Sequence, residues 1–133
     1  MEEIRVLLVE PDKEPRLVTV EHRLENLQKM VGGTLQAVYP WTDAVILVCD
    51  DDGKGKGYPP NRMLLDEYGV PYDVVAGSFF ICGIGHDDFA SISDEMAEKY
   101  RERFLYPEIF LPRPDGGIFW HRIGSGEGIH LIG

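Results

Sequence analysis

Short apolar runs broken by proline and glycine constrain the fold of this chain more than any other feature. Ile4–Val9 is mostly apolar and is stopped by Pro11, and Ala44–Cys49 is apolar throughout and rich in β-branched side chains. Runs of this length bounded by turn residues predict buried β-strands. Tyr72–Val75 and Ser78–Gly83 add two further strands on either side of a glycine.

Other segments have weaker strand patterns. Thr34–Tyr39 alternates apolar and polar positions up to Pro40, which is typical of a half-buried strand. Its short connection to Ala44 favours an antiparallel hairpin. The remaining candidates are Arg16–Val20, either a strand or an entry into a helix, then Ile109–Leu111, Ile118–Trp120, and Ile129–Ile132 as a terminal strand or a frayed end.

Two segments have helical periodicity. Apolar residues at Val20, Leu24, Leu27 and Val31 follow the i, i+4, i+7, i+11 spacing of a helix, with Thr19 as the N-cap and Gly32-Gly33 as the end.

The later helix begins at Ser93, whose hydroxyl suits an N-cap, and its buried stripe is Met96, Tyr100 and Phe104. Asn61–Tyr68 is predicted as an additional short helix. These elements predict an α+β fold: a mixed, mainly antiparallel sheet of about five strands, with two principal helices packed on one face.

The length suits one folding unit. A chain of 133 residues falls within the usual size of a single domain. Residues 1–123 are therefore predicted as one α+β domain. Residues 124–133 are rich in glycine, a composition typical of flexible linkers, and are predicted as a tail.

The chain is acidic, with a formal net charge of −10. An acidic surface repels phosphate backbones, so duplex nucleic acid is a disfavoured partner. The excess charge has two interpretations: it keeps the protein soluble, or it offers an acidic face to a basic partner, such as the nucleic-acid groove of a host protein.

Cysteine content and hydropathy favour a cytoplasmic protein. The two cysteines, Cys49 and Cys82, each end an apolar run, where free thiols behave as small hydrophobic groups. No basic-then-apolar leader opens the sequence, and no apolar run approaches the roughly 20 residues of a membrane span. We expect no membrane partner, no metal and no cofactor. A sheet edge that needs protection favours a homodimer.

A glycine–lysine loop follows the strand Ala44–Cys49. Glycines let a backbone approach an anion, and lysines add charge, so the loop could hold a phosphorylated ligand such as a nucleotide. The loop lacks the P-loop pattern, and the other interpretation is an ordinary connection. The candidate ligand-binding residues are Gly53, Lys54, Gly55, Lys56, Gly57, Tyr58, Asn61 and Arg62.

A second candidate set flanks this loop. Tyr39 and Trp41 lie near strand ends, where they either anchor a partner or cover the sheet ends. Asp50, Asp51 and Asp52 are consecutive rather than spaced as in a calcium loop, so turn formation and solvation are favoured over cation binding. We take these five residues as a candidate protein interface.

His86, Asp87 and Asp88 form the one histidine–carboxylate grouping that suggests acid–base catalysis. Adjacent side chains in an extended loop point apart, so the trio does not automatically converge. The sequence leaves the enzyme question open and favours a non-catalytic role.

The order of elements resembles the family called domain of unknown function 3846. The resemblance spans roughly Ile4 to Phe110, and the Gly-rich extension after Arg122 departs from the family core. It rests on Leu24–Gly33, Leu35–Pro40, Asp52–Lys54, Pro59–Arg62, Ala76–Ile81 and Ser91–Glu95.

That family is carried mostly by phages and mobile elements of Gram-positive bacteria, so the resemblance implies mobile-element biology. The leading hypothesis is a non-catalytic binding protein that acts on a host macromolecule, with counter-defence as one such role. The alternatives are a binder of a small phosphorylated ligand, through the glycine–lysine loop, and an enzyme that uses His86 with Asp87 or Asp88.

Overall fold

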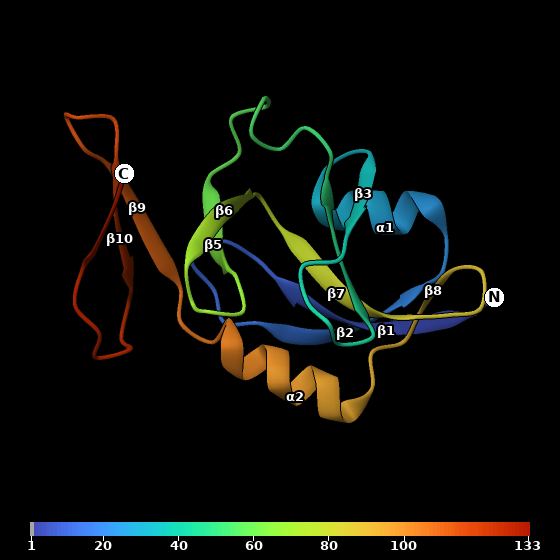
Figure 1. Cartoon of the computed structure of the whole chain (residues 1–133). Helices are drawn as coiled ribbons and strands as arrows, with labels where there is room; N and C mark the ends of the chain where they lie inside the picture. Colours follow the sequence, from blue (N-terminus) through green and yellow to red (C-terminus); the bar gives the residue numbers. More distant parts are fainter. Residues whose placement is uncertain (1) are drawn as a thin grey trace.

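A six-stranded antiparallel sheet forms the centre of the protein (Figure 1). The structure is a computed structural model that describes residues 2–133. The strands are β1 (Glu3–Val9), β2 (Arg16–Glu21), β3 (Leu35–Val38), β4 (Val45–Asp50), β7 (Phe79–Ile84) and β8 (Phe89–Ala90). Their order is β2-β1-β7-β4-β3, with β8 paired to β7. The fold is α+β, as predicted, and is mostly sheet. The expected β3–β4 hairpin is confirmed as an antiparallel pair.

Both faces of this sheet are buried. Side chains alternate between faces along a strand, and in β1 Leu7 and Val9 belong to one core cluster while Val6 and Leu8 belong to another. Helix α2 (Asp94–Arg103) covers the first face and α1 (Leu24–Val31) covers the second. The prediction that both helices share one face is therefore wrong, because the central strands are apolar at consecutive positions and present two apolar faces.

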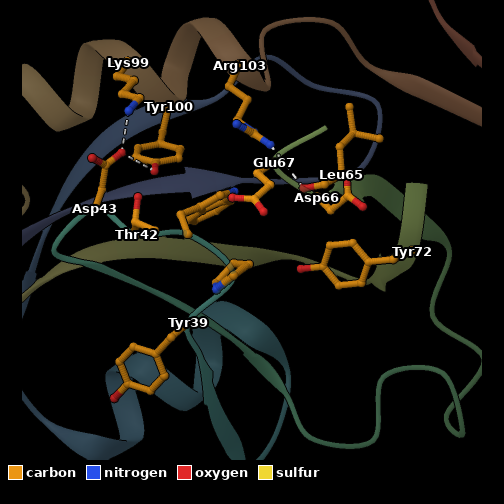
Figure 2. Close-up of a pocket in the computed structure, with 12 residues that line it drawn as sticks. Tyr39, Thr42, Asp43, Leu65, Asp66, Glu67, Tyr72, Lys99, Tyr100 and Arg103 are labelled. Carbon is orange, nitrogen blue, oxygen red and sulfur yellow. Dashed lines mark hydrogen bonds and ion pairs between the residues drawn. The ribbon is translucent and has the colours of Figure 1, made fainter. Parts of the chain in front are cut away.

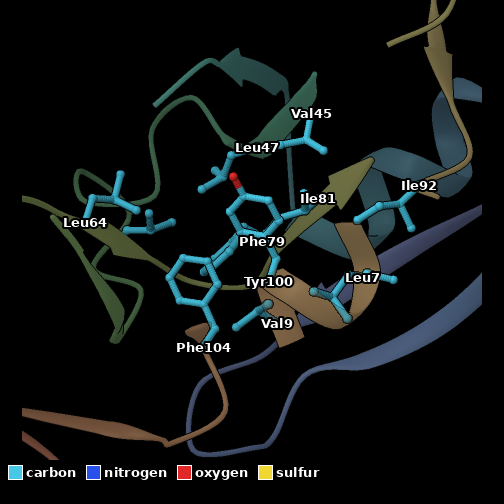
Figure 3. Close-up of a cluster of buried hydrophobic side chains, with 12 residues drawn as sticks. Leu7, Val9, Val45, Leu47, Leu64, Phe79, Ile81, Ile92, Tyr100 and Phe104 are labelled. Atoms are coloured by element: carbon cyan, nitrogen blue, oxygen red, sulfur yellow. The ribbon is translucent and has the colours of Figure 1, made fainter. Parts of the chain in front are cut away.

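The cluster under α2 also receives a hairpin (Figure 3). Strands β5 (Pro60–Leu65) and β6 (Pro71–Ala76) pair antiparallel and contribute Leu64 and Val75 to this cluster. The predicted short helix at Asn61–Tyr68 is wrong. The turn that closes the hairpin instead depends on Asp66, whose Oδ1 accepts hydrogen bonds from the backbone N–H groups of Tyr68 and Val70, both at 2.9 Å.

The helix ends follow local capping chemistry. The backbone N–H of Met96 donates to Ser93 Oγ at 3.2 Å, which confirms the predicted N-cap of α2. Gly32 closes α1 with φ +94°, as expected for a left-handed C-cap residue. The predicted start of α1 is too early, because Val20 pairs with Ile4 inside β2 and the helix begins only at Leu24.

The C-terminal segment forms a separate three-stranded sheet beside the main body (Figure 1). Its strands are β9 (Glu108–Pro112), β10 (Ile118–Arg122) and β11 (His130–Ile132), in the order β11-β10-β9. The predicted boundary at residue 123 falls between β10 and β11. Residues 130–132 of the predicted tail pair with β10. Within residues 2–133, no helix has the length and apolarity that crossing a bilayer requires.

Replacing Leu47 by alanine tests the buried face under α2. Leu47 has no exposed surface. The cavity and the lost apolar contact should lower the free energy of unfolding by about 2–5 kcal/mol. Leu24→Ala is the matched control, since Leu24 is 59% exposed, and it should change stability by no more than about 0.5 kcal/mol. Urea unfolding of both variants measures the difference, and equal losses would contradict this assignment of the core.

Candidate functional site

A groove of about 660 Å³ lies where three segments meet (Figure 2). The connection between β3 and β4, the turn of the β5–β6 hairpin and the second half of α2 supply its walls. We call it the aromatic groove, because four aromatic side chains line it: Tyr39, Trp41, Tyr72 and Tyr100.

The four aromatic residues have different positions in the groove. Trp41 is partly buried and packs on Tyr100 and Phe104, with ring centroids 4.4 Å and 5.9 Å apart. Tyr39 and Tyr72 are 63% and 53% exposed. From the sequence, Tyr39 and Trp41 either anchor a partner or cover the sheet ends. The two residues differ in this respect: Trp41 packs against the core beneath the groove, and Tyr39 stays accessible at the rim of the groove.

Charged groups hold the floor of the groove in place. Asp43 accepts hydrogen bonds from Lys99 Nζ at 2.5 Å and from Tyr100 Oη at 2.6 Å. These bonds, from Lys99 first, lower the pKa of Asp43, and burial raises the pKa of Tyr100. The Arg103 guanidinium lies 5.6 Å from the centre of the Trp41 ring. The floor is therefore fixed before any ligand arrives.

One acidic side chain remains unpaired in the groove. Glu67 forms no ion pair within the part of the chain that the structure describes, and Figure 2 shows its side chain directed toward the middle of the groove. Asp66, its neighbour, is already engaged by the hairpin turn. Glu67 is therefore the carboxylate that a cationic group entering the groove would meet.

A second cavity of about 290 Å³ adjoins the aromatic groove. Neighbouring residues line the two hollows: Val38 and Tyr39, Leu64 and Leu65, Tyr72 and Asp73. The second cavity also takes Asp50, Asp51, Asp52 and Lys54 from the glycine–lysine loop. Four carboxylates and one lysine line this second cavity, and we call it the acidic end.

The lysines of the predicted phosphate loop are both paired with carboxylates. Lys54 Nζ lies 2.5 Å from Asp73 Oδ1, and Lys56 Nζ lies 2.7 Å from Asp50 Oδ2. Asp50 is buried, and its Oδ1 also accepts the backbone N–H of Asp52 at 3.0 Å. Asp50 thus has the predicted role in turn formation, and neither lysine is left without a counter-charge.

Tyr58 anchors the same loop to the body. Its hydroxyl donates to the carbonyl of Gly32 at 3.0 Å. Gly77, at φ +82°, leaves room for the ring, since a Cβ there would lie 2.6 Å from Tyr58 Cδ2. Gly53, Gly55 and Gly57 alternate with the two lysines in this turn, so the loop's shape has a structural explanation.

Asn61 and Arg62 lie in the core, away from the loop surface. Arg62 has no exposed surface and Asn61 is 1% exposed. The Arg62 guanidinium donates to the carbonyl oxygens of Phe104 and Lys13, at 3.0 Å and 2.7 Å, and to Asn61 Oδ1 at 2.8 Å. The expectation that Arg62 would join Lys54 and Lys56 around a phosphate therefore fails, because its donors are used inside the protein.

Glu108 completes this buried network and was not singled out from the sequence. Its Oε2 lies 3.8 Å from Arg62 Nε, and its Oε1 accepts from the Met63 backbone N–H at 2.9 Å and from Trp120 Nε1 at 2.6 Å. Burial raises the pKa of Glu108 and lowers that of Arg62. The network connects β5, β9, β10 and the end of α2.

The histidine–carboxylate trio does not converge. His86 and Asp87 are 98% and 89% exposed at the side chain, with 3.8 Å between their charged atoms. Asp88 faces another partner, His22, at 3.1 Å. No group of three His, Cys, Asp or Glu side chains suited to a metal ion occurs among residues 2–133. Burial raises the pKa of the Cys82 thiol to about 12, so it is held in its neutral form.

Sequence reasoning found part of the aromatic groove. It singled out Tyr39 and Trp41 but missed Tyr72, Lys99 and Arg103. The Asp66–Gly69 turn signal could have suggested a hairpin that brings Tyr72 into the groove that Tyr39 also lines. Lys99 and Arg103, four residues apart on α2, flank the buried Tyr100 and mark the rim of its apolar stripe.

Replacing Arg62 by methionine should lower the free energy of unfolding by about 3–5 kcal/mol, because it leaves Glu108 buried without its counter-charge. Lys54→Met is the matched control: its ion pair with Asp73 is exposed, and its loss should cost no more than about 1 kcal/mol. Urea unfolding reports both values. A loss below about 1 kcal/mol for Arg62→Met would contradict the stabilising role given to the network.

The Asp50–Lys56 pair makes stability depend on acid pH. The hydrogen bond from Lys56 is the main cause that lowers the pKa of Asp50 below its ordinary value of 3.8. A carboxylate with a lowered pKa in the folded state stabilises the fold above its unfolded pKa, and this contribution is lost as pH falls through the folded pKa.

Lys56→Met should therefore lower stability at pH 7 and reduce the further loss below about pH 4, as measured by thermal unfolding across pH. Lys54→Met should keep the wild-type profile, because its partner Asp73 is about half exposed. An unchanged acid profile in Lys56→Met would show that the pair does not couple folding to pH.

The chain was compared with known families, curated proteins and solved structures. The sequence profile of a family described as Domain of unknown function (DUF3846) matches residues 4–105. Neither the curated proteins nor the solved structures contain a significant match. The matched span runs from the second residue of β1 to just past α2, includes the whole aromatic groove and ends before β9. This chain therefore belongs to the DUF3846 family.

Proposed function

We propose that this protein is a non-catalytic binding protein, of phage or mobile-element origin, that acts on a host protein by holding one of its segments in the aromatic groove. The observation that carries the proposal is the convergence of four aromatic side chains from three separate segments around one open hollow. Aromatic residues are the usual energetic anchors of protein interfaces.

The groove has features of a prepared binding surface. Tyr39 and Tyr72 expose more than half of their surface, although aromatic side chains gain most from burial. The floor beneath them is fixed by the packing of Trp41 on Tyr100 and by the pairing of Asp43 with Lys99. A floor that is already ordered reduces the entropy lost on binding.

Charge favours a basic segment as the ligand. Glu67 is unpaired inside the groove, and the acidic end adds the exposed Asp51 and Asp52. A net charge of −10 attracts basic surfaces at long range and raises association rates. A host-protein segment with a large apolar or aromatic residue for the groove and lysine or arginine for the acidic end fits both parts. Blocking such a segment is one route to counter-defence.

The two alternatives have weaker support. A phosphorylated ligand at the glycine–lysine loop would have to displace Asp73 from Lys54 and Asp50 from Lys56. Arg62 would not be available to contact such a ligand, because its side chain is buried. An enzyme built on His86 would have to work with fully exposed side chains on a loop where Asp88 pairs with His22 instead.

The test selects ligands without assuming a host. Random peptides displayed on phage are selected on the immobilised full chain, and enriched sequences are synthesised with a fluorescent label for anisotropy titration. We expect enrichment of an aromatic or large apolar residue together with lysine or arginine. The double variant Tyr39→Ala, Tyr72→Ala should weaken binding about tenfold or more, since each tenfold step is about 1.4 kcal/mol. Binding should also weaken as salt is raised.

Tyr68→Ala is the matched control, because Tyr68 lies in the same hairpin turn, is 83% exposed and does not line the groove. Equal affinity in the groove variant and in this control would overturn the proposal. A parallel thermal-shift screen with nucleotides tests the phosphorylated-ligand alternative. A stabilisation that disappears in Lys54→Ala, Lys56→Ala would favour that alternative instead.

A further inference from the structure

One face of the C-terminal sheet carries a row of exposed apolar side chains, and the only group found over them among residues 2–133 is the Arg113 guanidinium, 5.8 Å from the centre of the Phe119 ring. In the register of this sheet, Phe119 on the central strand β10 lies opposite Leu111 on β9 and opposite Leu131 on β11. Leu111 and Leu131 are 54% and 63% exposed, and Phe119 is 36% exposed. Ile109, two residues before Leu111 and on the same face of β9, is 39% exposed.

The opposite face of the same sheet is occupied by contacts within the protein, which centre on Trp120. Trp120 is 3% exposed, donates its indole N–H to Glu108 and packs against the His130 ring at 4.6 Å. The Arg122 guanidinium lies 4.9 Å from the Trp120 ring centre. Since neighbouring residues of a strand point to opposite faces, the row Leu111–Phe119–Leu131 is directed away from these contacts. Figure 1 shows the sheet standing at the side of the body.

The charge of this sheet differs from that of the rest of the chain. Residues 106–133 contain three acidic and two basic side chains, so nearly all of the net charge of −10 belongs to residues 1–105. The charges present are paired nearby: Arg113 with Asp115 at 2.6 Å and Arg122 with Glu127 at 3.2 Å. Glu108 faces the buried Arg62. This sheet has almost no excess negative charge to attract a basic partner. Two copies of the acidic chain would repel each other less at this sheet than at residues 1–105.

The row is also complementary to itself. It has a leucine on each side of a central phenylalanine, so a two-fold axis beside Phe119 places apolar side chains against apolar side chains. Interfaces between identical chains are most often of this symmetric kind. We propose that two copies of this chain associate by packing these faces of their C-terminal sheets against each other.

The size of the face sets the strength of this association. A sheet of three strands and five residues measures about 14 Å by about 17 Å. It buries a few hundred Å² on each copy, less than the roughly 800 Å² per partner of a stable interface. We therefore expect a weak dimer with a dissociation constant in the micromolar range or above. Its acidic bodies repel each other, so added salt should strengthen it, the opposite of the salt effect expected at the aromatic groove.

Sedimentation velocity of the full chain from about 5 μM to about 500 μM tests the proposal. The wild type should shift from monomer to dimer over this range, and more completely at higher salt. Leu131→Gln and Phe119→Gln should each raise the dissociation constant about tenfold or more. Leu24→Gln is the matched control, a leucine of similar exposure, 59%, on α1, and it should dimerise like the wild type.

Circular dichroism checks that each variant is folded. If a glutamine variant does not fold, Leu131→Lys is tested in its place, because Leu131 is the most exposed position of the row. A wild type that stays monomeric throughout would overturn the proposal, as would equal association of Leu131→Gln and Leu24→Gln. The groove variant Tyr39→Ala, Tyr72→Ala should dimerise normally, so this result is independent of peptide binding.

Discussion

The buried guanidinium of Arg62 is the interaction on which the arrangement of the elements most depends. A charged group without solvent contact is stable only where every donor finds an acceptor. Here the acceptors come from the loop after β1, from the end of α2 and from β9. One side chain thereby fixes the hairpin that carries it against both the helix and the C-terminal sheet. The position of Tyr72, and so one wall of the aromatic groove, follows from this constraint.

The groove exists because the sheet is covered unevenly on the α2 face. Helix α2 and the β5–β6 hairpin cover most of that face, and the strip over β3 and β4 is left open between two loops. Trp41, which packs on Tyr100 of α2, lines one of the two hollows, and Asp50, which pairs with Lys56, lines the other. The rigid core thus holds two chemically different ends, one aromatic and one acidic, at a fixed separation.

Local chemistry explains which parts of this fold could be predicted from the sequence. The Ser93 cap, the Gly32 helix end and the β3–β4 hairpin depend on neighbouring residues, and all three are as expected. Strand β5 lies where the sequence predicts a helix over Asn61–Tyr68, because the strand depends on pairing with β6. Arg62 looked like a surface ligand for the same reason: the carbonyl groups that bury it come from residues about 40 or more positions away.

The Arg62–Glu108 contact also bears on where this protein can be divided. The span shared with the DUF3846 family ends at residue 105, just before the carboxylate that neutralises Arg62 and accepts the Met63 N–H. A boundary drawn by sequence similarity would therefore separate the two halves of one buried ion pair. The shared region and the folding unit are thus different lengths of chain.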